Sequence, residues 1–387
     1  MFKEYKELLS IENVLKDAYN YEFNGNMKEL LQKDFVELEG NGVDALMWFN
    51  YEGERYLFKP LKDAKINVWG EILSSYLAEY LGIPHAEYRI ASFNGQLGVV
   101  TKSIIKGKEK LVLGAELFQE FMNQYPYKNK KEILIKNKLF RYLYDIPDDF
   151  LKLKPYDRKR YLFNYLNNLD CIQSIVFNFN EIERTDKTRI IEGLRKNLIF
   201  DIITMQYDRH PNNWGIIANK NVRYSPLFDN STSFGLNYPN MEEHIMEFNR
   251  NMMTYYKDAL IRGLDPEENR KDILYRAFPT LVVDTEDSID PMKKIKKKIP
   301  EVLEHYLRIS DKEDNEIAIQ MISSVSSNLI EKLIRQAEAE NYMEMDSTTF
   351  NYILTLFDNH LEILQSIIET YRRKQDGVTR SKWIQTI

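Results

Sequence analysis

The segment MQYDRHPNNWG, residues 205–215, constrains this chain more than any other part of its sequence. It places an Asp, an Arg, a His and two Asn directly after residues 186–205, where apolar residues recur every three or four positions and predict a buried helix. Polar residues this dense usually form a solvated turn. The alternative is a loop that holds charged groups in fixed positions, and the spacing of its side chains favours that alternative.

The spacing of acid and amide in this loop suits phosphoryl transfer. Asp208 and Asn213 lie five residues apart, and Asp229 ends the second strand of a hairpin expected at residues 214–229. Transfer from ATP needs a carboxylate that takes the acceptor's proton, and an Asn and a second Asp that hold Mg²⁺. The spacing is that of a kinase catalytic loop. We therefore expect Asp208 to be the base, and Asn213 and Asp229 to be the magnesium ligands.

The preceding residues predict a small antiparallel sheet that carries one helix. Three strand-like segments, 34–40, 43–50 and 55–60, come before a helical pattern at 67–82. Two further strands follow on either side of a hairpin turn at 94–95. This β-β-β-α-β-β order is the one that a kinase nucleotide lobe requires.

Candidate nucleotide-binding residues fall on the matching elements of this lobe. Lys59 ends the third strand, where a lysine reaches the ATP phosphates, and Glu71 lies on the next helix, where it can pair with that lysine. Gly40 and Gly42 lie between the first two strands, where a loop that covers phosphates belongs. The same residues also fit ordinary structural roles, since G-x-G is common in hairpin turns and a glutamate in a first helical turn is favoured by the helix dipole.

The whole-chain composition fits a folded protein of two or three lobes with 387 residues, 43% hydrophobic. A net charge of −6 argues against nucleic-acid binding by bulk electrostatics. The single Cys171 excludes an intramolecular disulfide framework. No apolar run reaches the ~18 residues of a membrane span, so we expect a cytoplasmic protein.

We expect an α+β fold with two lobes, like that of protein kinases. It combines a small antiparallel sheet lobe that has one helix with a larger, mainly helical lobe. The predicted divisions are a helical lead-in at 1–30, a nucleotide lobe at 31–103, a catalytic part at 104–240 and a helical remainder at 241–387.

Three quoted segments resemble the HipA-like serine/threonine kinases: YLFKPLKD, GEILSSYLAEYLGIPHAEYRI and QYDRHPNNWGII with PLFDNSTSFG. They are similar, more distantly, to the phosphoinositide kinases. The resemblance covers residues 35–235 and implies the base, metal ligands and lysine–glutamate pair named above. It also implies that His210 organises the loop or contacts phosphate, and that the cofactors are ATP and Mg²⁺.

Two departures from HipA toxins stand out in the sequence. Gln206 occupies a position where those toxins commonly carry Asn, and the loop GNGVDALMW has no Ser to be phosphorylated. The resemblance implies a protein substrate with a Ser or Thr acceptor, and an antitoxin-like partner. A phosphoinositide or small-molecule acceptor, and a nucleotide-sensing pseudokinase, stay open as alternatives.

One basic segment, Lys293–Lys298, is not required by the phosphoryl transfer described above. A solvated helix face explains it most simply, and a docking patch for an acidic partner, RNA or anionic lipid is the alternative.

Overall fold

The structure is a computed structural model, and it describes residues 9–11, 36–39, 46–51, 53–61, 64–93, 95–124, 166–236, 241–275, 281 and 298–384. The chain divides into two compact units that interleave in sequence. Unit 1 comprises residues 1–107, 226–266 and 326–357, and unit 2 comprises residues 108–225, 267–325 and 358–387. Gly40, Gly42 and Lys293–Lys297 lie outside the described residues.

Unit 1 contains a six-stranded sheet with the strand order β1-β5-β6-β4-β3-β2. Its strands are β1 (Leu9–Ser10), β2 (Val36–Glu39), β3 (Leu46–Tyr51), β4 (Glu54–Pro60), β5 (Tyr88–Phe93) and β6 (Gln96–Lys102). All neighbouring pairs are antiparallel except β1 and β5, which are parallel. Along the chain, β2, β3 and β4 precede a helix and β5 and β6 follow it, so the predicted β-β-β-α-β-β order of elements is confirmed.

Strand β1 differs from the sequence prediction, because Leu9–Ser10 lie within residues 1–30, which we expected to be helical. The pair is held by the backbone of Ala91 and Ser92 on β5, a contact that no periodicity within the segment encodes. Next to it, Ile11 is fully buried in an apolar cluster with Met47, Phe49, Phe58, Ala91, Phe93 and Val100.

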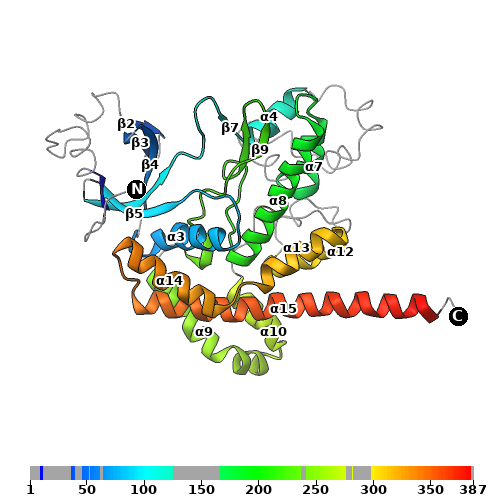
Figure 1. The fold of residues 1–387 in the computed structure, drawn as a ribbon. Coiled ribbons are helices and arrows are strands. Elements are labelled where there is room, and N and C mark those ends of the chain that lie inside the picture. Colours follow the sequence, from blue (N-terminus) through cyan, green and yellow to red (C-terminus); the bar gives the residue numbers. More distant parts are fainter. Residues whose placement is uncertain are drawn as a thin grey trace, which may run out of the picture. The chain divides into compact units, whose positions relative to one another are not determined.

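Helix α3 (Ala64–Tyr80) packs against β5 and β6, as Figure 1 shows. It corresponds to the predicted helix at 67–82. The helices of unit 1 also include α9 (Met241–Arg262), α14 (Ser327–Asn341) and the first part of α15 (Ser347–Ile384). Helix α14 packs against α3, although more than 250 residues separate some of their contacting residues in the chain.

Unit 2 combines a three-stranded sheet with several helices. The strands are β7 (Lys110–Leu113), β8 (Gly215–Ala218) and β9 (Val222–Tyr224), in that order. The helices include α4 (Gly114–Gln124), α7 (Leu169–Asn178), α8 (Arg184–Thr204), α10 (Pro266–Leu274), α12 (Ile299–Ile309), α13 (Lys312–Ser323) and the later part of α15. The β8–β9 hairpin follows the candidate loop, as the sequence predicts, whereas β7 was not anticipated.

Helix α8 confirms the periodicity that predicted it. Its apolar positions Ile191, Leu194, Leu198 and Ile202 are all buried. Met205 then adopts a left-handed conformation, with φ of 54°, and this ends the helix directly before the candidate loop. None of the helices in the described ranges is both long enough and apolar enough to cross a membrane.

Candidate active site

In unit 1, the side chain of Lys59 connects two carboxylates. It extends from β4 and donates from Nζ to Glu71 Oε1 at 2.9 Å and to Asp229 Oδ1. The lysine side chain is 18% exposed and that of Glu71 is fully buried, so water screens their interaction only weakly. The structure therefore brings together three of the residues predicted from sequence, although Asp229 lies 170 positions from Lys59.

Burial lowers the pKa of the Lys59 ammonium, but the charges of Asp229 and Glu71 outweigh this effect and hold the pKa well above its usual range. For Glu71, burial raises the pKa of the carboxyl, while Lys59 acts in the opposite direction. The charges of Lys59 and Glu71 therefore stabilise each other in this site.

Glu71 also binds the segment that carries Asp229. Its second oxygen, Oε2, accepts the Asn230 N–H at 2.7 Å. Asp229 adopts a left-handed conformation, with φ of 55°, and its N–H donates to the Tyr88 hydroxyl at 3.3 Å. Such a backbone conformation is uncommon for a non-glycine residue and needs support from its surroundings. Helix α3 and strand β5 provide that support through Glu71 and Tyr88.

Gly70 allows α3 to approach this segment closely. A Cβ atom at Gly70 would lie 2.4 Å from the Ser231 carbonyl oxygen, which is a backbone atom. Any larger residue would therefore push α3 away from the residues that follow Asp229. Because Glu71 is the next residue on α3, the same displacement would move it away from Lys59.

In unit 2, the candidate loop is built around a buried arginine. The side chain of Arg209 is fully buried and pairs with Asp201 of α8, with Nη2 to Oδ1 at 2.9 Å and Nε to Oδ2 at 3.1 Å. Its Nη1 donates to the carbonyl oxygen of Asn213 at 2.8 Å. One guanidinium thus joins the end of the helix to the far side of the loop, as a planar fork of donors can.

Further polar side chains complete this network. Asn197 donates to Asp201 at 2.8 Å and accepts the Tyr224 hydroxyl at 2.6 Å. Asn167 donates to the Arg209 carbonyl oxygen at 2.8 Å and accepts the Trp214 indole N–H at 2.9 Å. The loop therefore rests on buried and half-buried side chains from three separate parts of unit 2.

Within the loop, Asn213 is oriented by Asp208. The Asn213 Nδ2 donates to the Asp208 carbonyl oxygen at 2.8 Å, and the Asn213 N–H donates to the His210 carbonyl oxygen at 2.8 Å. Because a carbonyl only accepts, the amide nitrogen must face it, and the Oδ1 oxygen is the atom of this amide that can bind a cation. The Asp208 N–H donates to the side chain of Gln206 at 3.2 Å.

His210 has a contact within the loop itself. Its Nδ1 accepts the backbone N–H of Asn212 at 3.2 Å. This geometry suits the loop-organising role considered for His210, since it closes a local turn. Trp214, by contrast, is buried beneath the loop, stacked on Tyr224 and in edge contact with Phe118.

The predicted site residues therefore fall into two groups, each of which is assembled within one unit. Unit 1 brings together Lys59, Glu71 and Asp229, and unit 2 brings together Asp208, His210 and Asn213. Sequence reasoning missed the supporting residues Asn167, Asn197, Asp201 and Tyr224. A signal for Asp201 existed, because an acidic residue interrupts an otherwise apolar helix end directly before the loop.

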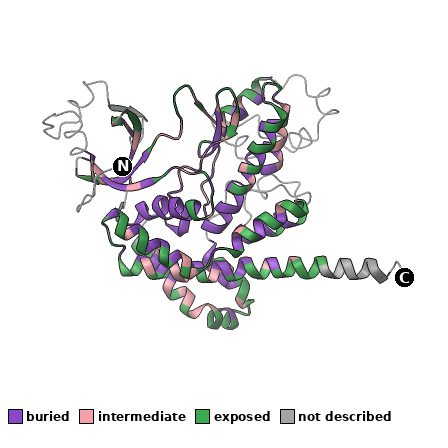
Figure 2. Ribbon diagram, viewed as in Figure 1, coloured by how far each residue is buried: buried purple, intermediate pink, exposed green. Residues whose placement is uncertain are grey.

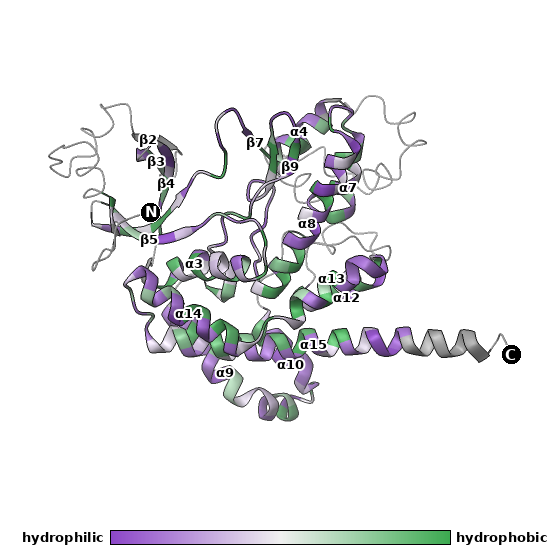
Figure 3. Ribbon diagram, in the orientation of Figure 1, coloured by the Kyte–Doolittle hydropathy of each residue, from purple (hydrophilic) through white to green (hydrophobic). Residues whose placement is uncertain are grey.

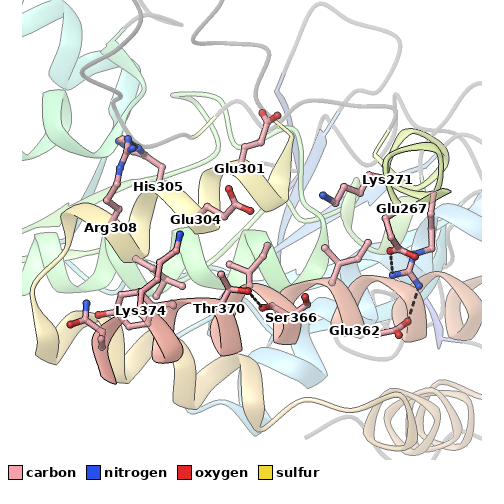
Figure 4. A pocket seen from close by; sticks show the side chains of 16 residues that line it. Glu267, Lys271, Glu301, Glu304, His305, Arg308, Glu362, Ser366, Thr370 and Lys374 are labelled. Atoms are coloured by element: carbon pink, nitrogen blue, oxygen red, sulfur yellow. Dashed lines mark hydrogen bonds and ion pairs between the residues drawn. The ribbon is translucent and has the colours of Figure 1, made fainter. Parts of the chain in front are cut away.

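A separate groove of about 1040 Å³ lies between α10, α12 and α15 of unit 2. Figure 4 shows that its charged side chains come from all three helices. Four basic residues (Arg270, Lys271, Arg308 and Lys374) face four acidic ones (Glu267, Glu301, Glu304 and Glu362). Arg270 pairs with Glu267 within α10 and with Glu362 of α15 across the groove. None of the predicted site residues lines this groove.

Comparison with known proteins places the fold. No protein-family model and no curated protein sequence matches the chain. The crystal structure of a Helicobacter pylori proinflammatory kinase, CtkA, is similar with a TM-score of 0.55 and 16% identity, over 89% of this chain and 97% of that one. HipA of Shewanella oneidensis, in its complex with HipB and operator DNA, gives a TM-score of 0.41 at 12% identity, over 91% of this chain and 73% of that one.

The similarity to CtkA extends over 89% of this chain and 97% of that one, and this chain itself contains the sheet with one helix that the sequence predicts. The expected α+β fold, with its small antiparallel sheet and larger helical part, is confirmed. The chain thus has the kinase-like fold that its resemblance to the HipA-like kinases implied.

Proposed function

We propose that the chain is an ATP- and Mg²⁺-dependent phosphotransferase that acts on a Ser or Thr hydroxyl of a protein. One observation carries the proposal: Lys59 is paired with Glu71 and Asp229 in unit 1. A fully buried glutamate and a strained aspartate are costly to maintain, and a lysine that positions nucleotide phosphates accounts for both. The kinase-like fold agrees with this chemistry.

The two groups of residues fit the proposed cofactors by the type of their donor atoms. Mg²⁺ prefers oxygen ligands, and in nucleotide enzymes it is held by one or two protein groups together with phosphate oxygens and water. Asp229 offers a carboxylate, and the fixed amide of Asn213 offers Oδ1. We infer that these two residues would hold the ion, which would neutralise charge on the phosphates.

In the proposed reaction, each residue has a separate task. Lys59, held by Glu71, orients the phosphates of ATP. The acceptor oxygen bonds to the γ-phosphorus as the bond from that phosphorus to the ADP oxygen breaks, and Asp208 takes the proton of the acceptor hydroxyl. The protein contributes mainly position and charge stabilisation rather than covalent chemistry.

Two adjacent asparagines provide a matched experiment. Asn213→Ala should remove a magnesium ligand, whereas Asn212→Ala changes an exposed neighbour in the same loop. We expect the first variant to need at least about tenfold more Mg²⁺ for half-maximal transfer of label from γ-labelled ATP to a generic protein, and the second to match the wild type. Equal magnesium requirements in both variants would refute the role of Asn213.

The acceptor class is tested in the same assay. Label on protein Ser or Thr supports the proposal, whereas label only on phosphoinositides or small hydroxyl compounds favours the alternative acceptor. Binding of ATP without transfer to any acceptor would favour a nucleotide-sensing role. An antitoxin-like partner stays a prediction that co-purification with a defined neighbouring gene product would test.

A further inference from the structure

Helix α9 carries an exposed apolar surface that the proposed function does not use. We define the α9 stripe as the residues Met246, Met253, Tyr256, Leu260, Ile261 and Leu264. All six are exposed, with Met253 the most exposed at 86%. Eleven large apolar residues are exposed in the described part of the chain, and six of them lie on this one helix and the turn after it. Such a concentration marks an interaction surface rather than random scatter.

The stripe is distinct from the face that holds α9 in unit 1. Ile245, Phe248 and Ala259 are buried and anchor the helix. Figure 2 shows exposed residues recurring along the same helix, and Figure 3 shows apolar ones among them. The residues of the stripe are therefore not the core-facing residues of α9, because Ile245, Phe248 and Ala259 already fill that role.

The spacing of the stripe is that of a helix that packs on another helix. Met246, Met253 and Leu260 are seven residues apart, and Tyr256 follows Met253 by three. The first three occupy the a positions of a heptad and Tyr256 occupies a d position, while Asn249 and Gly263 occupy the other d positions, so the seam is apolar mainly at a. A second helix laid along α9 would cover these side chains with one continuous apolar edge.

The charges beside the seam indicate the partner's chemistry. Arg250 and Lys257 each lie four residues after a seam methionine, at the positions that flank a coiled-coil interface. Both are exposed, and neither forms an ion pair with a described residue of this chain. Of the acidic residues on the helix, Glu247 lies three positions before Arg250, and Asp258 follows Lys257 and accepts the hydroxyl of Thr254 at 2.7 Å. Asp258 lies about 140° around the helix from Met253, away from the seam.

We propose that the α9 stripe binds an acidic amphipathic helix of a partner protein. The partner would place two carboxylates about two turns apart, near 10 Å, opposite Arg250 and Lys257. A second copy of this chain fits less well, because a two-fold pairing centred on the stripe brings the Lys257 ammonium groups of the copies together. A lipid surface also fits less well, because the polar side of α9 mixes acidic and basic residues, whereas helices that lie on membranes carry a polar face rich in Lys and Arg.

Two synthetic helical peptides test this with the full-length protein. Both carry Leu at the seam positions, and they differ only in having Glu or Lys at the flanking positions. Fluorescence anisotropy should show saturable binding of the Glu peptide and at least about tenfold weaker binding of the Lys peptide. The double variant Arg250→Glu/Lys257→Glu should reverse this preference.

A matched control carries the same change of charge elsewhere. Lys332→Glu/Arg372→Glu alters two exposed cations on other helices and should leave the preference intact. Equal binding of both peptides, no saturable binding, or no effect of the α9 charge reversal would overturn the proposal. Dimerisation through α9 in sedimentation, or flotation with phosphatidylglycerol vesicles that the α9 variant loses, would overturn it in favour of those occupants.

Discussion

Arg209 and Asp201 form a fully buried ion pair at 2.9 Å, directly beneath the loop that carries the candidate base. Burial raises the pKa of the Asp201 carboxyl, while Arg209 opposes that shift. The pair is costly to bury, and its geometry explains why it is retained. The same guanidinium also binds the Asn213 carbonyl oxygen and so sets the shape of the loop.

The first prediction concerns this pair. Asp201→Asn should lower the free energy of unfolding by about 3–5 kcal/mol, because it leaves the Arg209 charge buried without its partner. Urea unfolding followed by tryptophan fluorescence measures the change. Glu192→Gln, on an exposed position of the same helix, is the control and should stay within about 0.5 kcal/mol of the wild type. A loss of under 1 kcal/mol for Asp201→Asn would show that the pair does not support the loop.

A second prediction concerns nucleotide binding. Lys59→Met keeps the length of the side chain but removes the ammonium that joins Glu71 and Asp229. Calorimetry should show at least about tenfold weaker binding of Mg·ATP, because the phosphates lose the half-buried cation that orients them. Lys102→Met changes an exposed lysine of β6 that pairs with Glu54, and should leave binding unchanged. Equal affinity of the Lys59 variant and the wild type would remove Lys59 from the site.

A third prediction concerns pH and His360, which is fully buried on α15. Its Nε2 donates to the Ile202 carbonyl oxygen at 2.8 Å, and its Nδ1 accepts the Tyr275 hydroxyl at 2.7 Å. Both contacts suit the neutral ring, because the carbonyl can only accept and the phenol hydroxyl can donate. Burial lowers the pKa of His360 to about 4.

Between about pH 6.5 and 4, His360 therefore binds a proton in the unfolded chain but stays neutral in the folded chain. This contribution to stability is complete above that window and is lost as the pH falls through it, by up to about 3 kcal/mol. His360→Gln has no such titration. Thermal unfolding across the window should show a steeper acid loss for the wild type than for the variant, and parallel curves would contradict the assignment.

A fourth prediction concerns the contact between α14 and strand β5. Asn341 accepts the Ile90 N–H at 2.8 Å, and this amide is buried in unit 1. Asn341→Ala should cost about 1–3 kcal/mol, because the backbone donor loses its acceptor. Gln336→Ala, on the exposed side of the same helix, is the control. Hydrogen exchange at Ile90 should accelerate in the first variant alone, and unchanged exchange would refute the contact.

Local patterns in the sequence predicted the local parts of this structure. The period of α8, the turn after it and the strand order around α3 are each encoded within a few neighbouring residues. The group of Lys59, Glu71 and Asp229 was predicted because their residue types and order match one known chemistry.

The rest depends on contacts between distant residues. Asn341 and Ile90 are 251 positions apart, and Asp201 reads in isolation as one acid within a helix. Strand β1 has only two residues, too few for a period. The interleaving of the two units likewise depends on long-range contacts that no single segment shows.

The most direct test of the account is phosphoryl transfer by Asp208→Asn. This variant removes the proton acceptor and keeps the backbone carbonyl that binds Asn213. The account predicts that γ-labelled ATP with Mg²⁺ labels protein Ser or Thr in the wild type, and that the variant transfers at least about a hundredfold more slowly while binding ATP with similar affinity. Transfer by the variant at the wild-type rate would contradict the central claim that Asp208 is the base.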